Sequence, residues 1–309
     1  MTNKPKALKL QSSKVPYFSI VIPNYNGAAF IEPCLLALKK AISQCPSSLF
    51  EIILVDNGST DTSTDIFIKV LSSLKIENSC LPAGRVNLKI IRLQTNHGFA
   101  TAVNKGIVAS KYDYVCVLNN DLNLEPNWFD HISKAITNNP NFSTFCGTVL
   151  SYDGSKIESQ GLRYFMSGRC ENINNGKPFS TKVLKLKSSK VPVWGSSAAV
   201  VVYQKSAITK VGLFDESFFA YIEDVDLAYR LQKSGFKSLL IPKAISYHMG
   251  GRTSDSMGTL RQYYTLRNWI KLITKNYSKR ELVTNLPSIS IERLRNLSYL
   301  IRSSLIIKQ

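Results

Sequence analysis

Residues 114–124 read YVCVLNNDLNL, and this stretch decides how the rest of the chain is interpreted. Residues 114–118 are apolar or aromatic and predict a buried strand, which Asn119, Asn120 and Asp121 follow directly. A carboxylate at the end of such a strand is well placed to bind Mg²⁺ or Mn²⁺, which prefer oxygen ligands. Asn and Asp also favour turns, so these residues alone leave both a metal site and a polar turn open.

Short apolar runs and helical patterns alternate through the first 120 residues. We expect strands at 17–22, 51–55, 88–93 and 112–118, and helices at 30–43, 63–74 and 100–110. Strands that alternate with helices predict an α/β fold with a mostly parallel sheet, flanked by helices and joined by right-handed crossovers. In such sheets, ligands bind beyond the carboxyl ends of the strands.

The second half of the chain is less regular. We expect helices at 126–136, 205–212, 223–235 and 260–273, strands at 195–203 and 238–242, and an exposed loop at 171–190. The predicted organisation is a flexible basic tail at 1–16, one α/β domain at 17–253 and a basic helical extension at 254–309.

Polar segments follow the four expected N-terminal strands, at 23–27, 56–61, 95–104 and 119–123. The sequence has no GxGxxG after the first strand and no GxxxxGK[ST] at all, so the usual phosphate-binding loops are missing. A bound metal is the alternative we expect for holding phosphate. Asp56, directly at a strand end, is interpreted as a ligand contact, whereas Asp61 is expected to cap the next helix.

Three carboxylates, Glu223, Asp224 and Asp226, crowd the start of one expected helix. Acidic residues favour helix N-termini, and Asp226 with Arg230 has the spacing of an ion pair, so Asp226 is interpreted as structural. Glu223 and Asp224 instead follow the aromatic run FFAY, which could form a pocket wall. Adjacent, partly desolvated carboxylates have raised pKa values, which suit a general base.

Two other residues near expected strand ends are candidates. His248 lies before two glycines, where it could be a further metal ligand or simply a hydrogen-bonded polar residue. Trp194, before Gly195, is by default a core residue.

Composition narrows the class of protein. The chain has 309 residues and a net charge of +18, which would suit nucleic acid, an anionic membrane surface or an anionic substrate. No apolar run reaches the roughly 20 residues that a membrane-spanning helix needs, and the N-terminus has no secretory signal pattern. The six cysteines are scattered without a CxxC pair, which is typical of reduced, cytosolic proteins.

Seven segments in order resemble a known family: SIVIPNYNG, ILVDNGSTD, NHGFATAVNKG, VLNNDLNLEPNW, WGSSAAVVV, VGLFDESFFAYIEDVDLAYRL and SYHMGGRTS. They are similar to the family 2 inverting glycosyltransferases of the GT-A fold, which has a Rossmann-like, mixed but mostly parallel sheet. Within that family they look most like the rhamnosyltransferase and galactofuranosyltransferase branch. The resemblance spans about residues 17–273.

The resemblance implies roles for individual residues. The nucleotide pocket would be lined by Pro23, Tyr25, Asn26, Asp56, Asn96, Gly98, Asn104, Asn119 and Asn120. Asp121 and His248 would bind Mg²⁺ or Mn²⁺, Asp224 would be the catalytic base with Glu223 beside it, and Trp194 with Gly195 would contact sugar or acceptor. Asn119 departs from the family pattern, because it replaces the first acidic residue of the DxD motif.

The implied reaction moves a sugar, rhamnose-like or another hexose, from a dTDP- or UDP-linked donor to a saccharide or lipid-linked acceptor with inversion. The enzyme would work in the cytoplasm during cell-surface polysaccharide synthesis. Two other readings are kept: a catalytically silent sugar-nucleotide-binding module, and a basic nucleic-acid-binding protein. Carboxylates at 56, 121 and 224 disfavour nucleic acid as a partner, because they would repel phosphate.

The C-terminal region is strongly basic. Residues 250–309 carry 11 Lys and Arg against 3 Asp and Glu, with Tyr263, Tyr264, Trp269 and Tyr277 among them. A basic helix with interfacial aromatics can lie on anionic lipid, so we hypothesise peripheral association with the inner face of the cytoplasmic membrane. A solvated helical cap or a homodimer contact are the alternatives.

Overall fold

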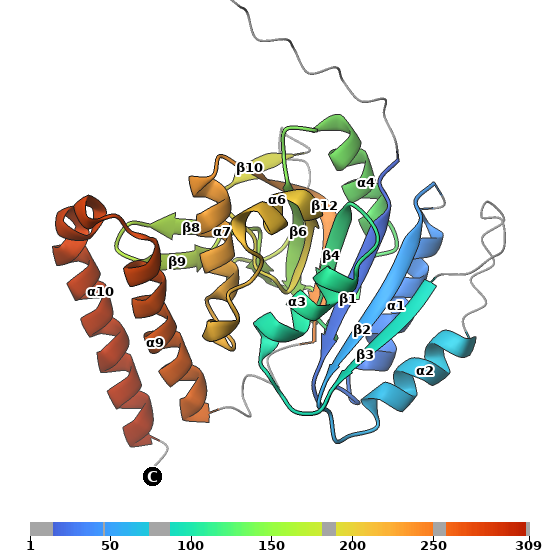
Figure 1. Cartoon of the computed structure of the whole chain (residues 1–309), viewed down its shortest axis with the longest axis horizontal. Coiled ribbons are helices and arrows are strands. Elements are labelled where there is room, and N and C mark those ends of the chain that lie inside the picture. The colour runs from blue at the N-terminus through green and yellow to red at the C-terminus, as the bar shows by residue number, and fades with distance from the viewer. Residues whose placement is uncertain (1–14, 46, 74–86, 181–189, 250–257, 307–309) are drawn as a thin grey trace, which may run out of the picture.

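The computed structural model describes residues 15–45, 47–73, 87–180, 190–249 and 258–306. Most of the predicted tail at 1–16 and part of the expected loop at 171–190 lie outside these residues. Within the described ranges, a ten-stranded sheet runs in the order β10-β12-β6-β11-β4-β1-β2-β3, with β5 paired to β12 and β7 paired to β6. A mixed, mostly parallel sheet flanked by helices is therefore confirmed (Figure 1).

The first half of the sheet is parallel. It consists of β1 (Phe18–Asn24), β2 (Phe50–Asn57), β3 (Asn87–Leu93) and β4 (Tyr114–Leu118), in which β1 pairs with β2 and β4, and β2 pairs with β3. The apolar runs in the sequence become these strands because the sheet is covered on both faces, so nearly every side chain of β1 and β2 is buried. All four strands end at one edge.

The second half of the sheet is mixed. The strand β11 (Val200–Gln204) runs antiparallel between β4 and β6 (Thr144–Ser151), and β12 (Ser238–His248) is parallel to β6. Short strands complete it: β5 (Leu122–Leu124), β7 (Ile157–Ser159) and β10 (Val191–Val193). A separate hairpin joins β8 (Leu162–Phe165) to β9 (Arg169–Asn172). Because β6 and β12 run in the same direction as β4, their ends reach the same edge.

Two expected strands have different limits. The strand expected at 195–203 begins only at Val200, because residues 196–199 are irregular and end in a turn at 198–199. The strand expected at 238–242 continues to His248, across a register shift between Leu240 and Ile245. Pro242, which has no N–H to donate, lies in that shift, so the ladder breaks there and then resumes.

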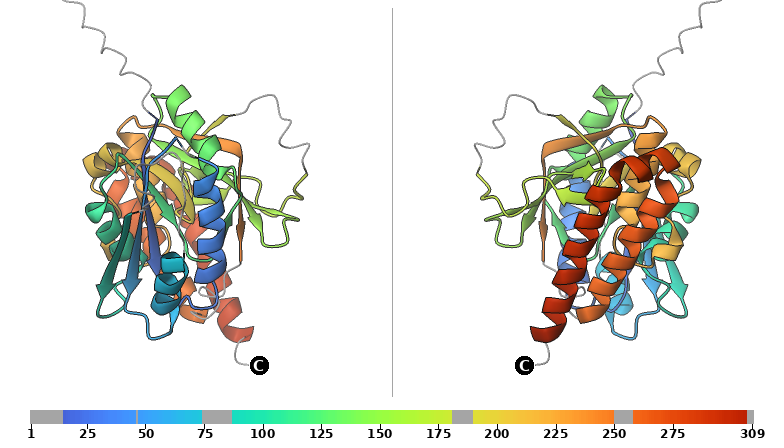
Figure 2. Two further views of the ribbon diagram at one scale, coloured as in Figure 1. Left: turned by 90° about the vertical axis from the view of Figure 1, so that its right-hand side faces the viewer. Right: turned by 90° about the vertical axis from the view of Figure 1, so that its left-hand side faces the viewer.

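Helices cover both faces of the sheet (Figures 1 and 2). One apolar core contains residues of α1 (Ile31–Ser43), α2 (Ser63–Ser73) and α4 (Trp128–Asn138). The core on the other face contains residues of α3 (Phe99–Ala109), α6 (Lys205–Val211) and α7 (Glu223–Lys233). A short 3₁₀ helix, η1 (Glu216–Phe218), precedes α7.

The C-terminal extension is a pair of helices, α9 (Gly258–Asn276) and α10 (Lys279–Ile306), which lie side by side (Figure 2). A third apolar cluster joins them to α7 and the β8–β9 hairpin through Trp269, Leu272, Tyr277 and Ile289. The proposed domain boundary at 253/254 falls outside the described residues and stays a prediction. Among the described helices, none is both long and apolar enough to cross a membrane.

Candidate active site

The carboxyl ends of the parallel strands bring the first predicted site residues together. Asn24 of β1 is the register partner of Asp56 of β2, and β4, which Asn119 follows, pairs with β1 on its other side. Asp56 is buried and accepts a hydrogen bond from the Ser59 N–H at 3.1 Å. The expectation that these polar strand ends share one edge of the sheet therefore agrees with the topology.

Two of the strand-end loops are fastened to each other. The Asn26 N–H donates to Ser59 Oγ at 3.0 Å, and Asn26 Oδ1 accepts from the Thr60 N–H at 2.8 Å. Asp61 accepts from the Ala28 N–H at 2.8 Å and from the Ser63 N–H, at the start of α2, at 3.0 Å. Asp61 thus has the capping role expected for it, while Pro23, half-buried, and Tyr25, exposed, lie in the same loop.

Asn24 joins those loops to the end of β4. Its side-chain amide donates to Ser63 Oγ at 2.8 Å, and its Oδ1 accepts from Asn120 Nδ2 at 2.7 Å. A side chain at Gly27 would place its Cβ 2.1 Å from Asn120 Nδ2 and 2.4 Å from Asn24 Oδ1, so it would displace this hydrogen bond. Asn120 is predicted to bind nucleotide, but its amide nitrogen donates a hydrogen bond to Asn24 of the protein itself.

The loop after β3 is held by Asn57, a residue that sequence reasoning did not select. Asn57 Nδ2 donates to Asn96 Oδ1 at 2.9 Å and to Gly98 O at 3.1 Å, and its Oδ1 accepts from the His97 N–H at 3.0 Å. Gly98 has a φ of +86°, and a Cβ there would lie 2.4 Å from Phe219 O. Asn96 and Gly98 are thus placed beside the loops that carry Asn26 and Asp56.

Asn104 does not join this group. Its amide donates to Phe214 O at 2.8 Å and to Glu216 Oε1 at 3.0 Å, and it accepts from the Phe214 N–H at 3.1 Å. The side chain lies on the buried side of α3, where protein groups use both ends of the amide. Asn104 thus links α3 to the segment before α7, and its expected contact with the nucleotide stays a prediction.

Asp121 and His248, which are predicted to bind a metal, are in direct contact. His248 Nε2 lies 3.1 Å from Asp121 Oδ2, and His248 Nδ1 lies 2.7 Å from Glu158 Oε2. Burial alone would lower the pKa of His248, but the hydrogen bonds to the two carboxylates raise it to about 10. Glu158, on β7, was not selected from the sequence, because 90 residues separate it from His248 and no local pattern connects them.

The residues at the end of β4 suit a divalent cation. Asn119 Oδ1 and Asp121 Oδ1 are both buried and have no hydrogen-bond partner among the described residues. No group of three or more His, Cys, Asp or Glu side chains in this part of the chain could hold a metal alone. Magnesium sites, however, commonly combine one or two carboxylates with substrate phosphates. His248 would have to give up a proton and its bond to Asp121 before it could act as a ligand.

The acidic pair lies beside this centre. Asp224 Oδ2 accepts from the Ala198 N–H at 3.2 Å, while the neighbouring Ala199 O accepts from the Asn119 N–H at 2.9 Å. Asp224 is half-buried, whereas Glu223 is buried and its Oε2 has no partner among the described residues. Burial raises the pKa of both carboxyls, and the charge of Asp224 raises that of Glu223 further.

The backbone before this pair is strained. Phe219, Tyr221 and Ile222 have φ values of 65°, 68° and 72°, in a backbone region that residues other than glycine rarely adopt. The Ala220 N–H bonds to Phe218 O at 2.8 Å, which closes a γ-turn at Phe219. Each such residue costs roughly 1–3 kcal/mol, so other contacts must hold the segment in place.

Trp194 and Gly195 lie at the start of the turn that leads into β11. The Trp194 ring stacks on Tyr164, with centroids 4.6 Å apart, and meets Tyr229 edge-on. A Cβ at Gly195 would lie 2.7 Å from Ala228 Cβ, so this glycine lets the chain approach α7 closely. Trp194 is only half-buried, and its contact with a sugar or acceptor stays a prediction.

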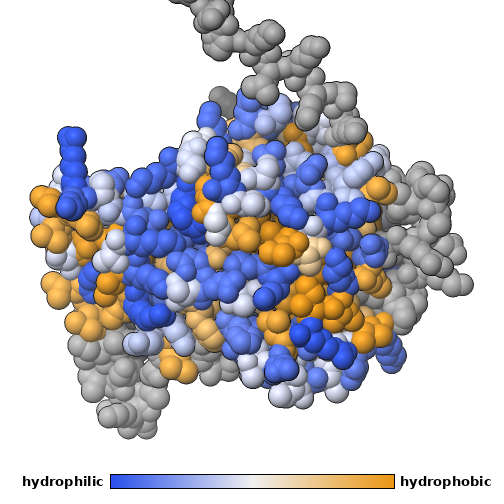
Figure 3. Space-filling view, in the orientation of Figure 1, coloured by the Kyte–Doolittle hydropathy of each residue, from blue (hydrophilic) through white to orange (hydrophobic). Residues whose placement is uncertain are grey.

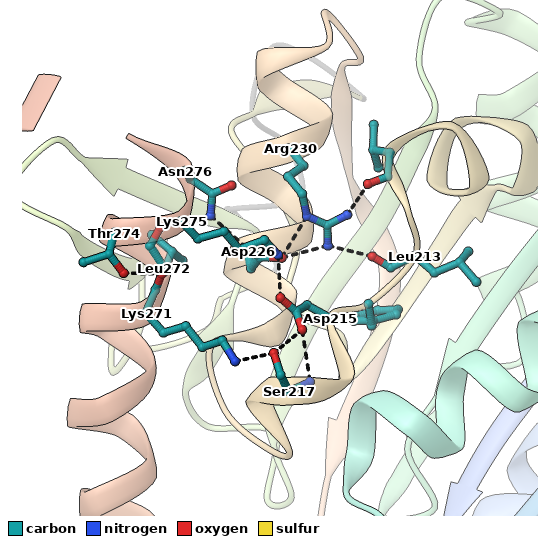
Figure 4. Close-up of polar contacts among 12 residues, drawn as sticks. Leu213, Asp215, Ser217, Asp226, Arg230, Lys271, Leu272, Thr274, Lys275 and Asn276 are labelled. Atoms are coloured by element: carbon teal, nitrogen blue, oxygen red, sulfur yellow. Dashed lines mark hydrogen bonds and ion pairs between the residues drawn. The ribbon is translucent and has the colours of Figure 1, made fainter. Parts of the chain in front are cut away.

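Asp226 takes the structural role expected for it. It is fully buried and pairs with Arg230 at 2.8 Å, one turn along α7 (Figure 4). It also accepts from Lys275 Nζ at 3.0 Å and Asn276 Nδ2 at 2.8 Å, both at the end of α9. The helix α7 and the C-terminal extension therefore share one buried carboxylate.

Comparisons with known proteins show what the chain is similar to. The family model described as glycosyl transferase family 2 matches residues 19–205, and the one described as glycosyl transferase family group 2 matches residues 115–301. A curated relative, the N-acetylglucosaminyl-diphospho-decaprenol L-rhamnosyltransferase of Mycobacterium tuberculosis, is 28% identical over 247 residues, which cover 74% of this chain and 75% of that protein.

Two solved structures share the fold. The mannosyltransferase PcManGT from Pyrobaculum calidifontis, in complex with GDP-Man and Mn²⁺, has a TM-score of 0.61 at 14% identity and covers 93% of this chain and 74% of its own. S. aureus TarS 1–349, in complex with UDP-GlcNAc, has a TM-score of 0.58 at 16% identity and covers 91% of this chain and 72% of its own.

Proposed function

Because the chain belongs to glycosyl transferase family 2 and has the GT-A fold, we propose that it transfers a sugar with inversion from a nucleoside diphosphate to an acceptor hydroxyl. This proposal depends on one observation: Asp224 and Asn119 are bonded to neighbouring residues of the same turn, Ala198 and Ala199. The proposed base and the strand end proposed to bind the donor are therefore close together. Neither alternative reading, a silent module or a nucleic-acid-binding protein, gains support from the comparisons.

The donor nucleotide would lie on the fastened loops at the parallel strand ends. Asp56, with Pro23, Tyr25 and Asn26, borders this area, and Asn96 and Gly98 close it. Backbone and amide groups there can bind a base and ribose, which suits a UDP or dTDP donor. The L-rhamnosyltransferase relative supports a rhamnose-like sugar.

The diphosphate would lie at the end of β4. Asp121, with its unpartnered Oδ1, and Asn119 would hold Mg²⁺ or Mn²⁺, which would neutralise the charge on the departing diphosphate. Asn119 adds an oxygen but no charge, so the substrate's own phosphates would supply much of the attraction for the ion.

Asp224 would act as the base. Its partial exposure leaves the carboxylate open to an acceptor hydroxyl, and its raised pKa makes it a stronger proton acceptor than an ordinary aspartate. As the acceptor oxygen bonds to the anomeric carbon, the bond to the diphosphate breaks, and the hydroxyl proton moves to Asp224. A single displacement inverts that carbon. Glu223, which is more deeply buried, holds its proton more tightly and so leaves the charge on Asp224.

The acceptor would be a saccharide, free or lipid-linked, reached from the cytoplasmic face of a membrane. Val283, Leu286, Leu294 and Leu297 of α10 are exposed and recur at helical spacing, so they form an apolar stripe. Hydrophobic surface is visible on the side of the molecule where the C-terminal helices lie (Figure 3). The exposed Lys279 and Arg280 lie at the start of the same helix. Apolar side chains beside cations suit an anionic lipid surface, where a lipid-linked acceptor would be found.

Sedimentation with vesicles tests the membrane contact. We expect the protein to bind vesicles containing phosphatidylglycerol at low salt. A Leu286→Ser, Leu294→Ser variant should bind at least about 100-fold more weakly, because two exposed leucine side chains that would insert into the lipid are lost. Thr284→Ser, on an exposed position of the same helix, is the control. Equal binding by all three proteins, or dimerisation through the stripe in place of lipid binding, would contradict this assignment.

A donor screen tests the function itself. Each of several nucleoside-diphosphate sugars is incubated with the protein and Mn²⁺, and both donor hydrolysis and thermal stabilisation are measured. We expect one nucleotide class to be hydrolysed slowly without an acceptor, and faster when a matching saccharide acceptor is added. Stabilisation without turnover, across acceptors, would favour the silent binding module instead.

A further inference from the structure

One buried side chain of the C-terminal extension holds the strained segment before the acidic pair. Asn268, on α9, is fully buried, and its Nδ2 lies 2.9 Å from Phe218 O, 2.9 Å from Ala220 O and 2.8 Å from Tyr221 O. Three carbonyl groups thus converge on a single amide. The three carbonyl groups belong to a segment in which residues 219, 221 and 222 have positive φ.

The same face of α9 makes further contacts with this segment. Tyr264, one turn before Asn268, stacks on Phe219 with centroids 5.3 Å apart. Lys271, about one turn after it, donates to Ser217 Oγ, and Lys275 donates to Asp215 at 2.7 Å. Residues at this spacing lie along one side of a helix, so α9 presents a continuous surface to residues 215–221.

On its other side, the segment meets the loop after β3. Phe219 O accepts from the Phe99 N–H at 2.7 Å, at the start of α3, and lies against Gly98. The segment therefore has three attachments: Asn268 of the extension, the loop proposed to border the nucleotide, and the Glu223–Asp224 pair that follows it directly in the chain.

We propose that Asn268 is a positioning residue for the transfer reaction, which sets the Glu223–Asp224 pair by holding residues 218–222 in their strained conformation. This inference rests on the proposed function. Without the Asn268 amide, its hydrogen bonds no longer offset the conformational strain of positive φ at Ile222. The backbone then relaxes, and the start of α7 shifts. A displacement of about 1 Å at a reacting group can cost on the order of a hundredfold in rate, even when the mutated residue touches no substrate.

The test compares Asn268→Ala with Asn285→Ala, a matched change on α10 that removes only an amide bonded to the backbone of its own helix. With the best donor from the screen, we expect Asn268→Ala to lower kcat about 10- to 100-fold and to change the KM for that donor less than about threefold. Asn285→Ala should leave both constants unchanged. Unchanged kcat in Asn268→Ala would overturn the proposal.

Rescue separates positioning from general loss of structure. Glycine tolerates positive φ without strain, so Ile222→Gly in the Asn268→Ala background should recover at least about fivefold in kcat, although it restores no hydrogen bond. If Asn268→Ala does not fold, Asn268→Ser is measured in the same way. A kcat that falls only as far as the folded fraction falls, with no recovery from Ile222→Gly, would identify Asn268 as a stability residue alone.

Amide exchange gives a readout that does not need activity. We expect faster hydrogen exchange at residues 218–224 in Asn268→Ala than in the wild type, with residues 56–61 unchanged. If the wild type turned over no donor, the proposed function would fail, while the exchange result would still show whether Asn268 holds the segment. If the wild type were active and neither kcat nor exchange changed, only the role of Asn268 would fail.

Discussion

The two halves of the candidate site use their polar groups in opposite ways. In the loops at 24–28 and 57–63, Asn24, Asn26 and Asp61 are bonded to other protein groups. At the centre, Asn119, Asp121 and Glu223 each keep a buried oxygen without a partner among the described residues. Because such an atom costs about 1–3 kcal/mol, the centre gives up stability that the loops do not. The loops form a framework, and the centre keeps its bonding capacity for a ligand.

The largest effect is expected at the centre, from Asp224→Asn. The amide keeps the shape of the side chain but cannot accept the proton, so we expect kcat to fall by about 10³-fold. Donor affinity, measured by calorimetry with the donor and Mn²⁺, should stay within about threefold, since Asp224 is not proposed to touch the nucleotide. Turnover that survives this change would remove Asp224 as the base.

The next effect concerns metal. Asp121→Ala removes the one carboxylate at the end of β4, and we expect donor affinity in Mn²⁺ to fall at least about 100-fold, to the level seen with EDTA. Asp153→Ala, in the exposed turn after β6, is the control, because its carboxylate bonds only to nearby serines. Donor binding that is indifferent to both EDTA and Asp121→Ala would exclude the metal role.

The variant Glu223→Gln tests the centre through the pH dependence of the free energy of unfolding. The raised pKa of Glu223 means that the folded state holds this proton more tightly than the unfolded state, so the wild type loses stability as pH rises above about 4.5. The variant lacks this dependence. Its advantage in free energy of unfolding should grow with pH by up to about 1.4 kcal/mol per unit, until the folded pKa is passed.

Urea unfolding at several pH values measures this difference. Glu32→Gln, at an exposed position of α1, should show no such trend. A Glu223→Gln variant whose advantage shrank as pH rose would contradict the assignment of a raised pKa.

The smallest effect is expected in the framework, from Asp61→Ala. Loss of the bonds to the Ala28 and Ser63 N–H groups should cost about 1–2 kcal/mol of unfolding free energy, as for other helix caps. Donor affinity should change less than about fivefold, because the loops keep the bonds of Asn24 and Asn26. Asp65→Ala, exposed in the same helical turn, provides the reference. If Asp121→Ala lowered the free energy of unfolding as much as Asp61→Ala does, the distinction between the loops and the centre would be contradicted.

The sequence predicted the framework well because its signals are local. The alternating pattern located β1 to β4 within about two residues, the error usual for such boundaries. The i,i+4 spacing identified the pair of Asp226 and Arg230. Because the strands were expected to be parallel, Asp56 and Asn119 were expected at the same edge of the sheet, although their contacts were unknown.

Other parts of the site depend on contacts between distant segments, which no local pattern encodes. Glu158 reaches His248, and Asn268 reaches the carbonyl groups at 218–221, only after the chain has folded. The family motif predicts a nucleotide contact for Asn104, and the structure adds a protein contact that the motif did not indicate, from its buried amide to Phe214 O. The left-handed backbone at Ile222 is equally unexpected, because β-branched residues avoid that conformation.

The buried carboxylate of Asp226 has a consequence for how such proteins can diversify. Its partners Lys275 and Asn276 belong to the extension, whereas Asp226 itself belongs to α7. Recombination that exchanged the C-terminal helices for those of a distant relative would leave a buried charge short of two partners. The extension should therefore diversify by substitution on the outer faces of α9 and α10, and not by exchange as an independent unit.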